Sequence, residues 1–210
     1  MTDIDNDIDS NSEAGRHAEK MKKRKAVQDA EVASKTIDAK GLLIVNTGPG
    51  KGKSTAAFGL VLRALGHGWN VGIVQFIKGA WDTGERRALE KFGTQVQFHA
   101  LGEGFTWETQ DKARDIAAAQ AAWAKSRELM ADASLKLIVL DELNIALRYD
   151  YLPLDEVLAA LSARREDLNV IVTGRNAKPD LIAAADLVTE MTLVKHHFKA
   201  GVKAQAGIEF

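Results

Sequence analysis

The chain has 210 residues, of which 46% are hydrophobic and 27% charged, with a formal net charge of -1 and no cysteine. This length and composition suit one domain with a sizeable core and an appendage. The near-neutral charge argues against a general attraction to nucleic acid or to an anionic membrane, and the lack of cysteine excludes disulfides, cysteine metal ligands and thiol nucleophiles.

The N-terminal residues are expected to lie outside the core. Residues 1–15 are rich in Asp, Asn and Ser and predict a disordered tail. Residues 16–40 are charged, with few apolar positions, and predict a helical arm, either a solvated helix or a segment that orders against a partner or substrate. The chain shows neither a signal peptide nor an apolar run of membrane-spanning length, so the sequence predicts a cytoplasmic protein.

From Gly41 onward, short apolar runs alternate with segments of helical period. The expected strands are 42–47, 71–77, 96–101, 135–143, 168–174 and 186–194, and the expected helices are 53–65, 83–93, 108–132, 154–166 and 179–185. Trp123 in the long helix is predicted to be a core residue. The alternation predicts an α/β domain over residues 41–210, a mostly parallel, RecA-like P-loop sheet with helices on both faces.

The first strand leads into TGPGKGKST (47–55), a P-loop with one irregularity. The standard pattern is G-x-x-x-x-G-K-[ST], and Thr47 stands where its first glycine belongs. Glycines in such a loop let backbone N–H groups approach phosphate oxygens at a helix N-terminus, lysines add positive charge, and a hydroxyl can meet a metal ion. The candidate ATP-binding residues are Thr47, Gly48, Gly50, Lys51, Gly52, Lys53, Ser54 and Thr55.

A second motif, LIVLDE (137–142), places two carboxylates after a buried strand. This is the Walker B pattern, which brings Asp141 and Glu142 to the carboxyl edge of the sheet, where ligands of open α/β folds bind. Mg²⁺ prefers such oxygen ligands. Ser54 and Glu142 are the predicted metal ligands, with Asp141 as a further candidate.

The residues alone leave the reaction open. Hydrolases and kinases need a group that positions water or takes a proton, and the histidines at 67, 99, 196 and 197 favour structural roles. Arg175 follows a strand end and is a candidate contact to the nucleotide. A P-loop ATPase or kinase and a RecA-like nucleotide sensor or DNA-associated ATPase both stay open, although KMKKRK (20–25) is the one strongly basic run.

Several blocks between Gly41 and Phe210 resemble the P-loop class of ATP:corrinoid adenosyltransferases. They include TGPGKGKSTAAFG, VLDEL and YDYLPLDEV and, more specifically, GFTWET (104–109) and VKHHFKAGVKAQAGIEF (194–210). The resemblance implies transfer of the 5′-deoxyadenosyl group of ATP to Co(I) of cobalamin or a corrinoid precursor, with release of triphosphate, in adenosylcobalamin biosynthesis and salvage. It also implies that ATP lies in the reverse sense in a shortened loop, and that Co(I) itself is the nucleophile.

The resemblance implies several further roles. Phe105 and Trp107 would press on the lower face of the corrin, displace the axial ligand of Co(II) and make its reduction feasible. Lys53 would stabilise the leaving triphosphate, with Mg²⁺ or Mn²⁺ as the metal, and Arg63 and Arg175 complete the predicted ATP-binding set. The expected partners are a second subunit, whose corrin site the N-terminal arm would cover, and a flavoprotein reductase, with no nucleic acid and no membrane.

Two residues depart from the family pattern. Pro49 stands where the family usually carries asparagine, and Ser54 replaces the usual threonine while keeping its hydroxyl.

Overall fold

The computed structural model describes residues 12–37, 40–77, 83–102 and 111–209. The chain divides into two compact units, Met1–Ala39 and Lys40–Phe210. None of the described helices is both long and apolar enough to cross a membrane.

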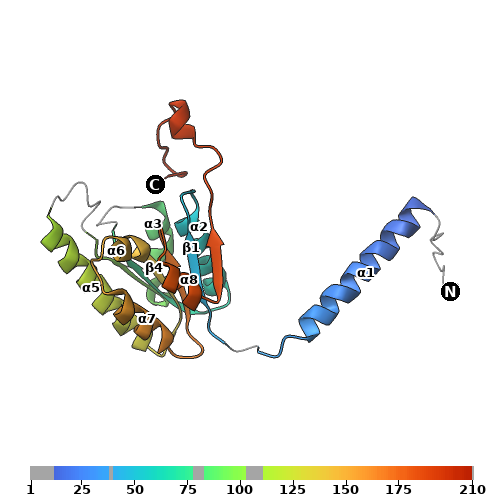
Figure 1. The fold of residues 1–210 in the computed structure, drawn as a ribbon, viewed down its shortest axis with the longest axis horizontal. Helices are drawn as coiled ribbons and strands as arrows, with labels where there is room; N and C mark the ends of the chain where they lie inside the picture. Colours follow the sequence, from blue (N-terminus) through green and yellow to red (C-terminus); the bar gives the residue numbers. More distant parts are fainter. Residues whose placement is uncertain (1–11, 38–39, 78–82, 103–110, 210) are drawn as a thin grey trace. The chain divides into compact units, whose positions relative to one another are not determined.

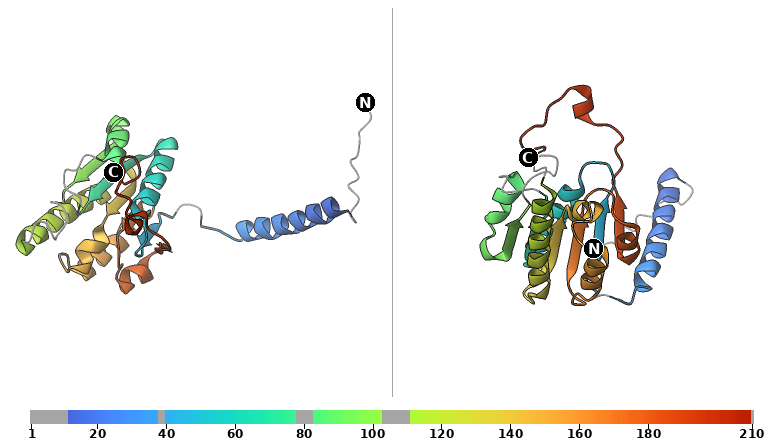
Figure 2. Two further views of the ribbon diagram at one scale, coloured as in Figure 1. Left: turned by 90° about the horizontal axis from the view of Figure 1, so that it is seen from above. Right: turned by 60° about the vertical axis from the view of Figure 1, so that its left-hand side comes forward.

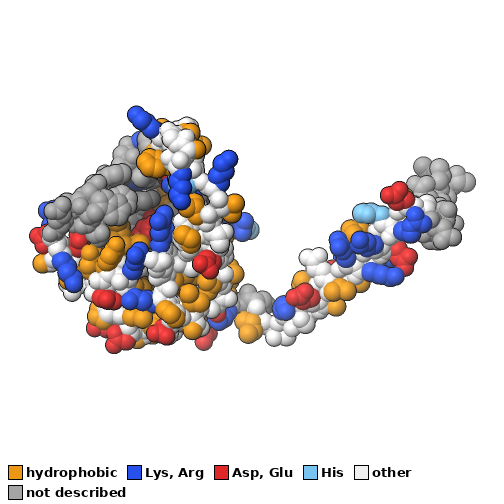
Figure 3. All heavy atoms as spheres, turned by 45° about the horizontal axis from the view of Figure 1, so that its top comes forward, with side chains coloured by type: hydrophobic (Ala, Val, Ile, Leu, Met, Phe, Trp, Pro, Cys, Tyr) orange, Lys and Arg blue, Asp and Glu red, His pale blue; other side chains and the backbone are white. Residues whose placement is uncertain are grey.

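The first unit contains helix α1 (Glu13–Ala33), which is held by local interactions. Its start is fixed by Ser12, whose hydroxyl accepts a hydrogen bond from Gly15 N at 3.0 Å. The helix therefore begins earlier than the expected start at Arg16. Exposed ion pairs one turn apart, such as Glu19 with Lys23 at 2.8 Å, support it along its length. Figure 3 shows the Lys and Arg side chains that gather along α1.

The second unit is built on a six-stranded sheet in the order β3-β2-β4-β5-β1-β6. Every neighbouring pair is parallel. The strands are β1 (Leu43–Thr47), β2 (Asn70–Gln75), β3 (Val96–Ala100), β4 (Leu135–Asp141), β5 (Asn169–Thr173) and β6 (Leu187–Glu190). The strand before the P-loop, β1, and the strand that ends in Asp141, β4, are thus separated only by β5.

Helices cover both faces of the sheet (Figure 1). The helices are α2 (Lys53–Gly66), α3 (Gly84–Glu90), α5 (Lys112–Ala131), α6 (Leu143–Arg148), α7 (Leu154–Ser162) and α8 (Pro179–Ala184), with 3-10 turns η1 (Gly93–Gln95) and η2 (His197–Ala200). Successive side chains of β1 enter opposite layers: Ile44 packs with α2 and α3, whereas Leu43 and Val45 pack with α5 to α8. Trp123 of α5 is buried in the latter core, as predicted.

The predicted parallel α/β sheet with helices on both faces is confirmed, and the main differences are one unpredicted helix and the extent of several elements. Helix α6 was not predicted, although Leu143, Ala146 and Leu147 have helical spacing and are buried. The last strand ends at Glu190 rather than at residue 194. Glu190 pairs with Thr47, the last residue of β1, so the edge strand has no neighbour beyond that point.

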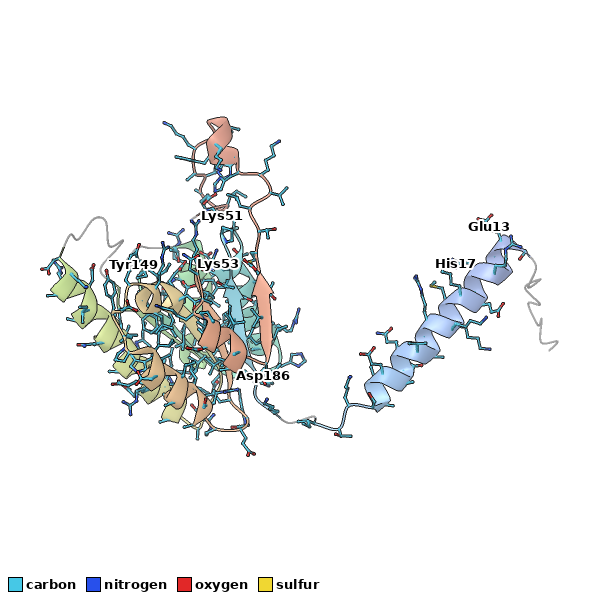
Figure 4. All side chains as sticks on the ribbon, in the orientation of Figure 1. Glu13, His17, Lys51, Lys53, Tyr149 and Asp186 are labelled. Carbon is cyan, nitrogen blue, oxygen red and sulfur yellow. The ribbon has the colours of Figure 1, made fainter. Side chains whose placement is uncertain are left out.

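The carboxyl ends of the strands and the start of the sheet lie at opposite ends of the unit. Figure 4 shows Lys51 and Lys53 at the same end as Tyr149, with Asp186 at the other end. At that other end Asp186 accepts a hydrogen bond from Leu43 N at 2.8 Å, which fixes the start of β1. The segment after β6 arches over the P-loop end, as the right-hand view of Figure 2 shows.

Candidate nucleotide-binding site

The P-loop joins β1 to α2 and folds around the ammonium group of Lys53. Gly48 and Gly52 have φ values of 95° and 101°, a left-handed backbone that favours glycine. Lys53 is 7% exposed, and its Nζ donates hydrogen bonds to Gly48 O at 3.0 Å and Gly50 O at 2.5 Å. Burial lowers the pKa of Lys53, and the nearby Glu142 carboxylate partly opposes that effect. The loop thus holds a buried cation at the N-terminus of a helix, which is suited to an anion.

Thr47, the residue that breaks the standard motif, is a structural link within the site. It is 5% exposed, and its hydroxyl accepts a hydrogen bond from Ala177 N at 3.1 Å. Ala177 lies in the turn after β5, which also carries Arg175. A glycine at this position would have no side chain to make this bond, so the substitution ties the P-loop to the neighbouring turn.

Asp141 is the centre of a buried hydrogen-bond network. The residue is 0% exposed, and its Oδ1 accepts hydrogen bonds from Ser54 Oγ and Thr173 Oγ1, both at 2.7 Å. Its Oδ2 accepts a further bond from Gln75 Nε2 at 2.9 Å. One carboxylate therefore links β2, β4 and β5 to the first turn of α2.

Glu142, in contrast, is partly exposed and has a strained backbone. Its φ is 64°, and its N–H donates to Thr173 Oγ1 at 2.9 Å. Close packing surrounds it, because a Cβ added to Gly174 would lie 3.0 Å from Glu142 Oε2. The conformation directs the chain from β4 into α6 and leaves the carboxylate near enough to Lys53 to influence its pKa.

The donor set fits a hard divalent cation. Ser54 donates its proton to Asp141, so the lone pairs of its oxygen stay available, and Glu142 adds a carboxylate at the same end of the sheet. Within the described ranges, no group of three or more His, Cys, Asp or Glu side chains could hold a metal ion. A site with one hydroxyl and one carboxylate is typical of Mg²⁺ that takes its remaining ligands from phosphate and water.

Arg175 is exposed and lies in a turn that is held at both ends by hydrogen bonds. Its neighbour Gly174 has a φ of 125°, and Gly174 O accepts a hydrogen bond from Asn144 Nδ2 at 2.9 Å. Thr47 holds the other end of the turn through Ala177. Arg175 also helps to lower the pKa of Lys53, so the two positive charges lie close enough to interact.

One predicted site residue among the described ones, Arg63, is not brought into this arrangement. Arg63 lies in the last turn of α2, about 15 Å from Lys53 at 1.5 Å of helix rise per residue, and is exposed. Phe105 and Trp107 lie outside the described residues. Of the other loop positions, Pro49 and Thr55 are exposed, and Lys51 forms an ion pair with Glu209.

Sequence reasoning missed Gln75, Thr173 and Asn144, which hold the site together. Gln75 and Thr173 are the polar last residues of the apolar strands β2 and β5, so a search for polar residues at strand ends would have found them. Asn144 gave no such signal. It is 0% exposed, with an amide that bonds to Gly174 and a buried Oδ1 that has no partner among the described residues.

Comparison with known proteins gives consistent matches along the chain. A family model described as "ATP:corrinoid adenosyltransferase BtuR/CobO/CobP" matches residues 39–210, and one described as "Cob(I)alamin adenosyltransferase N terminal" matches residues 6–32. A corrinoid adenosyltransferase of Pseudomonas aeruginosa is 58% identical over 93% of this chain and 96% of its own length. One from a Sinorhizobium species is 54% identical over 100% and 98%, and one from Salmonella typhimurium is 50% identical over 93% and 98%.

Proposed function

Because the chain belongs to the ATP:corrinoid adenosyltransferases, transferases of cobalamin biosynthesis, we propose that its P-loop holds the triphosphate of ATP while the ribose 5′ carbon reacts. Co(I) of a corrinoid attacks that carbon and forms the cobalt-carbon bond. The bond from the 5′ carbon to the triphosphate oxygen breaks, and triphosphate leaves with the electron pair. Co(I) supplies its own electron pair, so the reaction needs no side-chain base.

The observation that carries this proposal is the concentration of positive charge around a glycine loop. Lys53 lies within it, and Lys51 and Arg175 are close enough to affect the pKa of Lys53. Negative charge grows on the triphosphate as its bond to carbon breaks. Fixed cations and helix amides stabilise this charge more in the transition state than in the ground state, which lowers the barrier.

The donors at this end of the sheet support the proposed metal ligands, and the proposed direction of ATP is the one that the family resemblance implies. Ser54 and Glu142 would hold Mg²⁺ or Mn²⁺, which would neutralise part of the charge on the phosphates. Asp141 positions the Ser54 hydroxyl, because protein donors occupy both oxygens of the Asp141 carboxylate. ATP lies in the reverse sense, as in the family, so that its ribose is open to the corrin.

Product analysis tests the reaction. The chain is incubated without oxygen with ATP, Mg²⁺ and chemically reduced cobalamin, and the products are separated. We expect equimolar triphosphate and adenosylated corrinoid. Formation of ADP without a new cobalt-carbon species would instead indicate a P-loop ATPase or kinase.

Phe105 and Trp107 are proposed to make Co(I) accessible by displacing the axial ligand of Co(II). Axial ligands strongly affect the reduction potential of a metal centre. Replacing either residue by alanine is expected to lower the rate at least about tenfold when the reaction starts from Co(II) with a flavoprotein reductant. With preformed Co(I) the same variants should retain most of their activity. An equal loss under both conditions would contradict the reductive role.

The arm is proposed to cover the corrin site of a second subunit. On α1 the apolar side chains of Val27 and Val32 are 70% and 65% exposed, so they are available for a partner surface. A homodimer would have twice the chain mass of 22.8 kDa in sedimentation equilibrium, and a purely monomeric chain would contradict this arrangement.

A further inference from the structure

The segment after β6 contacts the P-loop at both of its ends. At its start, Met191 N donates to Thr47 O at 2.9 Å, and Met191 O accepts from Gly50 N at 2.6 Å. The segment then arches away through η2 and returns (Figure 2). At its far end, the Glu209 carboxylate pairs with the ammonium group of Lys51. We call residues 191–209 the C-terminal strap.

Glu209 is held in this position by Lys51 and lies beside His197. Its side chain is 15% exposed, whereas that of Lys51 is 56% exposed. His197 Nε2 lies 3.4 Å from Glu209 Oε1. The hydrogen bond from Lys51 is the main cause that lowers the pKa of the Glu209 carboxyl, so the carboxylate is charged at neutral pH. The strap therefore delivers a negative charge to the phosphate-binding loop.

Both lysines of the loop are thus engaged by oxygen atoms of the chain itself. Lys53 bonds to the carbonyls of Gly48 and Gly50, and Lys51 bonds to Glu209. A bound polyphosphate needs the same ammonium groups. Since Lys51 and Glu209 are 158 positions apart in the sequence, only the path of the strap brings this competing carboxylate to the loop.

We propose that Glu209 is an internal counter-anion of the P-loop, which pairs with Lys51 when the site is empty and is displaced by the triphosphate of ATP. The proposal rests on the proposed function, because it assumes that the loop binds a triphosphate. One carboxylate carries less charge than a triphosphate, so the ligand wins the competition but binds less tightly than it would to a free lysine. After the reaction, the returning carboxylate favours release of the triphosphate product.

The matched variants are Glu209→Gln and Glu166→Gln. Both remove one negative charge with little change of shape, and Glu166 is an exposed residue before β5, at the opposite end of the sheet from the P-loop. Calorimetric titration with inorganic triphosphate and Mg²⁺ measures the affinity. We expect E209Q to bind triphosphate about two- to fivefold more tightly than the unaltered chain, as the loss of a partly exposed ion pair predicts. E166Q should bind like the unaltered chain.

The outcomes separate this inference from the proposed function. Unchanged or weaker binding by E209Q, with normal binding by the other two proteins, would overturn the counter-anion and leave the adenosyl transfer intact. Equal tightening by E209Q and E166Q would indicate a general charge effect and would also overturn it. If the unaltered chain bound neither ATP nor triphosphate, the proposed function itself would fail.

Movement of the strap provides a second readout. The chain has no cysteine, so Ala206→Cys, at an exposed strap position, gives a single site for a spin label. We expect saturating triphosphate to increase the mobility of the label in the electron paramagnetic resonance spectrum. In the E209Q background the label should be mobile before any ligand is added. A label that stays equally immobile with and without triphosphate would overturn the displacement.

Discussion

Replacement of Asp141 by asparagine is expected to lower the free energy of unfolding by about 2–4 kcal/mol and to reduce adenosyl transfer to the detection limit. The carboxylate is fully buried and accepts hydrogen bonds from Ser54, Thr173 and Gln75. An amide of the same shape turns one acceptor oxygen into a donor, so at least one of the three protein donors loses its partner. A buried donor without a partner is costly because it has also lost its water.

Urea denaturation followed by tryptophan fluorescence measures the first effect, and product formation measures the second. Asp150→Asn is the matched control. The side chain of Asp150 is 82% exposed and makes one ion pair, with Lys178 at 3.1 Å, so its loss should change the stability by less than about 1 kcal/mol. If D141N were as stable and as active as D150N, Asp141 would not be the centre of the site.

Lys53→Met is expected to reduce the rate of adenosyl transfer by about 100-fold or more, with a smaller loss of stability than D141N. The ammonium group is the buried cation of the P-loop, and its loss removes charge stabilisation from the departing triphosphate. Methionine loses the hydrogen bonds to Gly48 O and Gly50 O, but this cost is partly offset because burial already disfavours the charged form, as the lowered pKa of Lys53 shows, and methionine keeps most of the apolar stem.

Steady-state rates with preformed Co(I), together with a thermal melt, test this prediction. Lys91→Met, at an exposed position just after α3, is the control and should behave like the unaltered chain in both measurements. K53M is therefore expected to affect mainly the rate, whereas D141N is expected to affect both the rate and the stability. A K53M protein that lost stability as D141N does would show that Lys53 mainly supports the fold of the loop, and one that kept its rate would exclude Lys53 from the chemistry.

The sequence predicted the sheet and both nucleotide motifs because each of these leaves a local pattern. Apolar runs at strand length and a glycine-lysine loop between a strand and a helix are local signals. Asp141 was correctly located at a strand end, but its role as holder of Ser54 depends on Thr173 and Gln75 of two other strands. Such a network is set by strand order, which the local pattern does not contain.

The long-range contacts of the P-loop could not be predicted for the same reason. Thr47 looked like a defect in a motif, yet its hydroxyl bonds to Ala177, 130 positions later. The contact between Lys51 and Glu209 also depends on where the chain goes after β6. The extent of the last strand was wrong because it is limited by the end of β1, its one sheet partner, and not by its own apolar residues.

Two glycines of the loop, Gly48 and Gly50, face the segment that follows β6. A Cβ at Gly48 would lie 2.5 Å from Met191 O, and one at Gly50 would lie 2.6 Å from Thr192 O. These two oxygens belong to the backbone of the segment after β6, which has little room to move away from an added side chain. Folding alone would therefore keep both positions free of side chains, even in a related protein that no longer bound a nucleotide. Glycines at these two positions are thus weaker evidence for catalysis than the motif suggests.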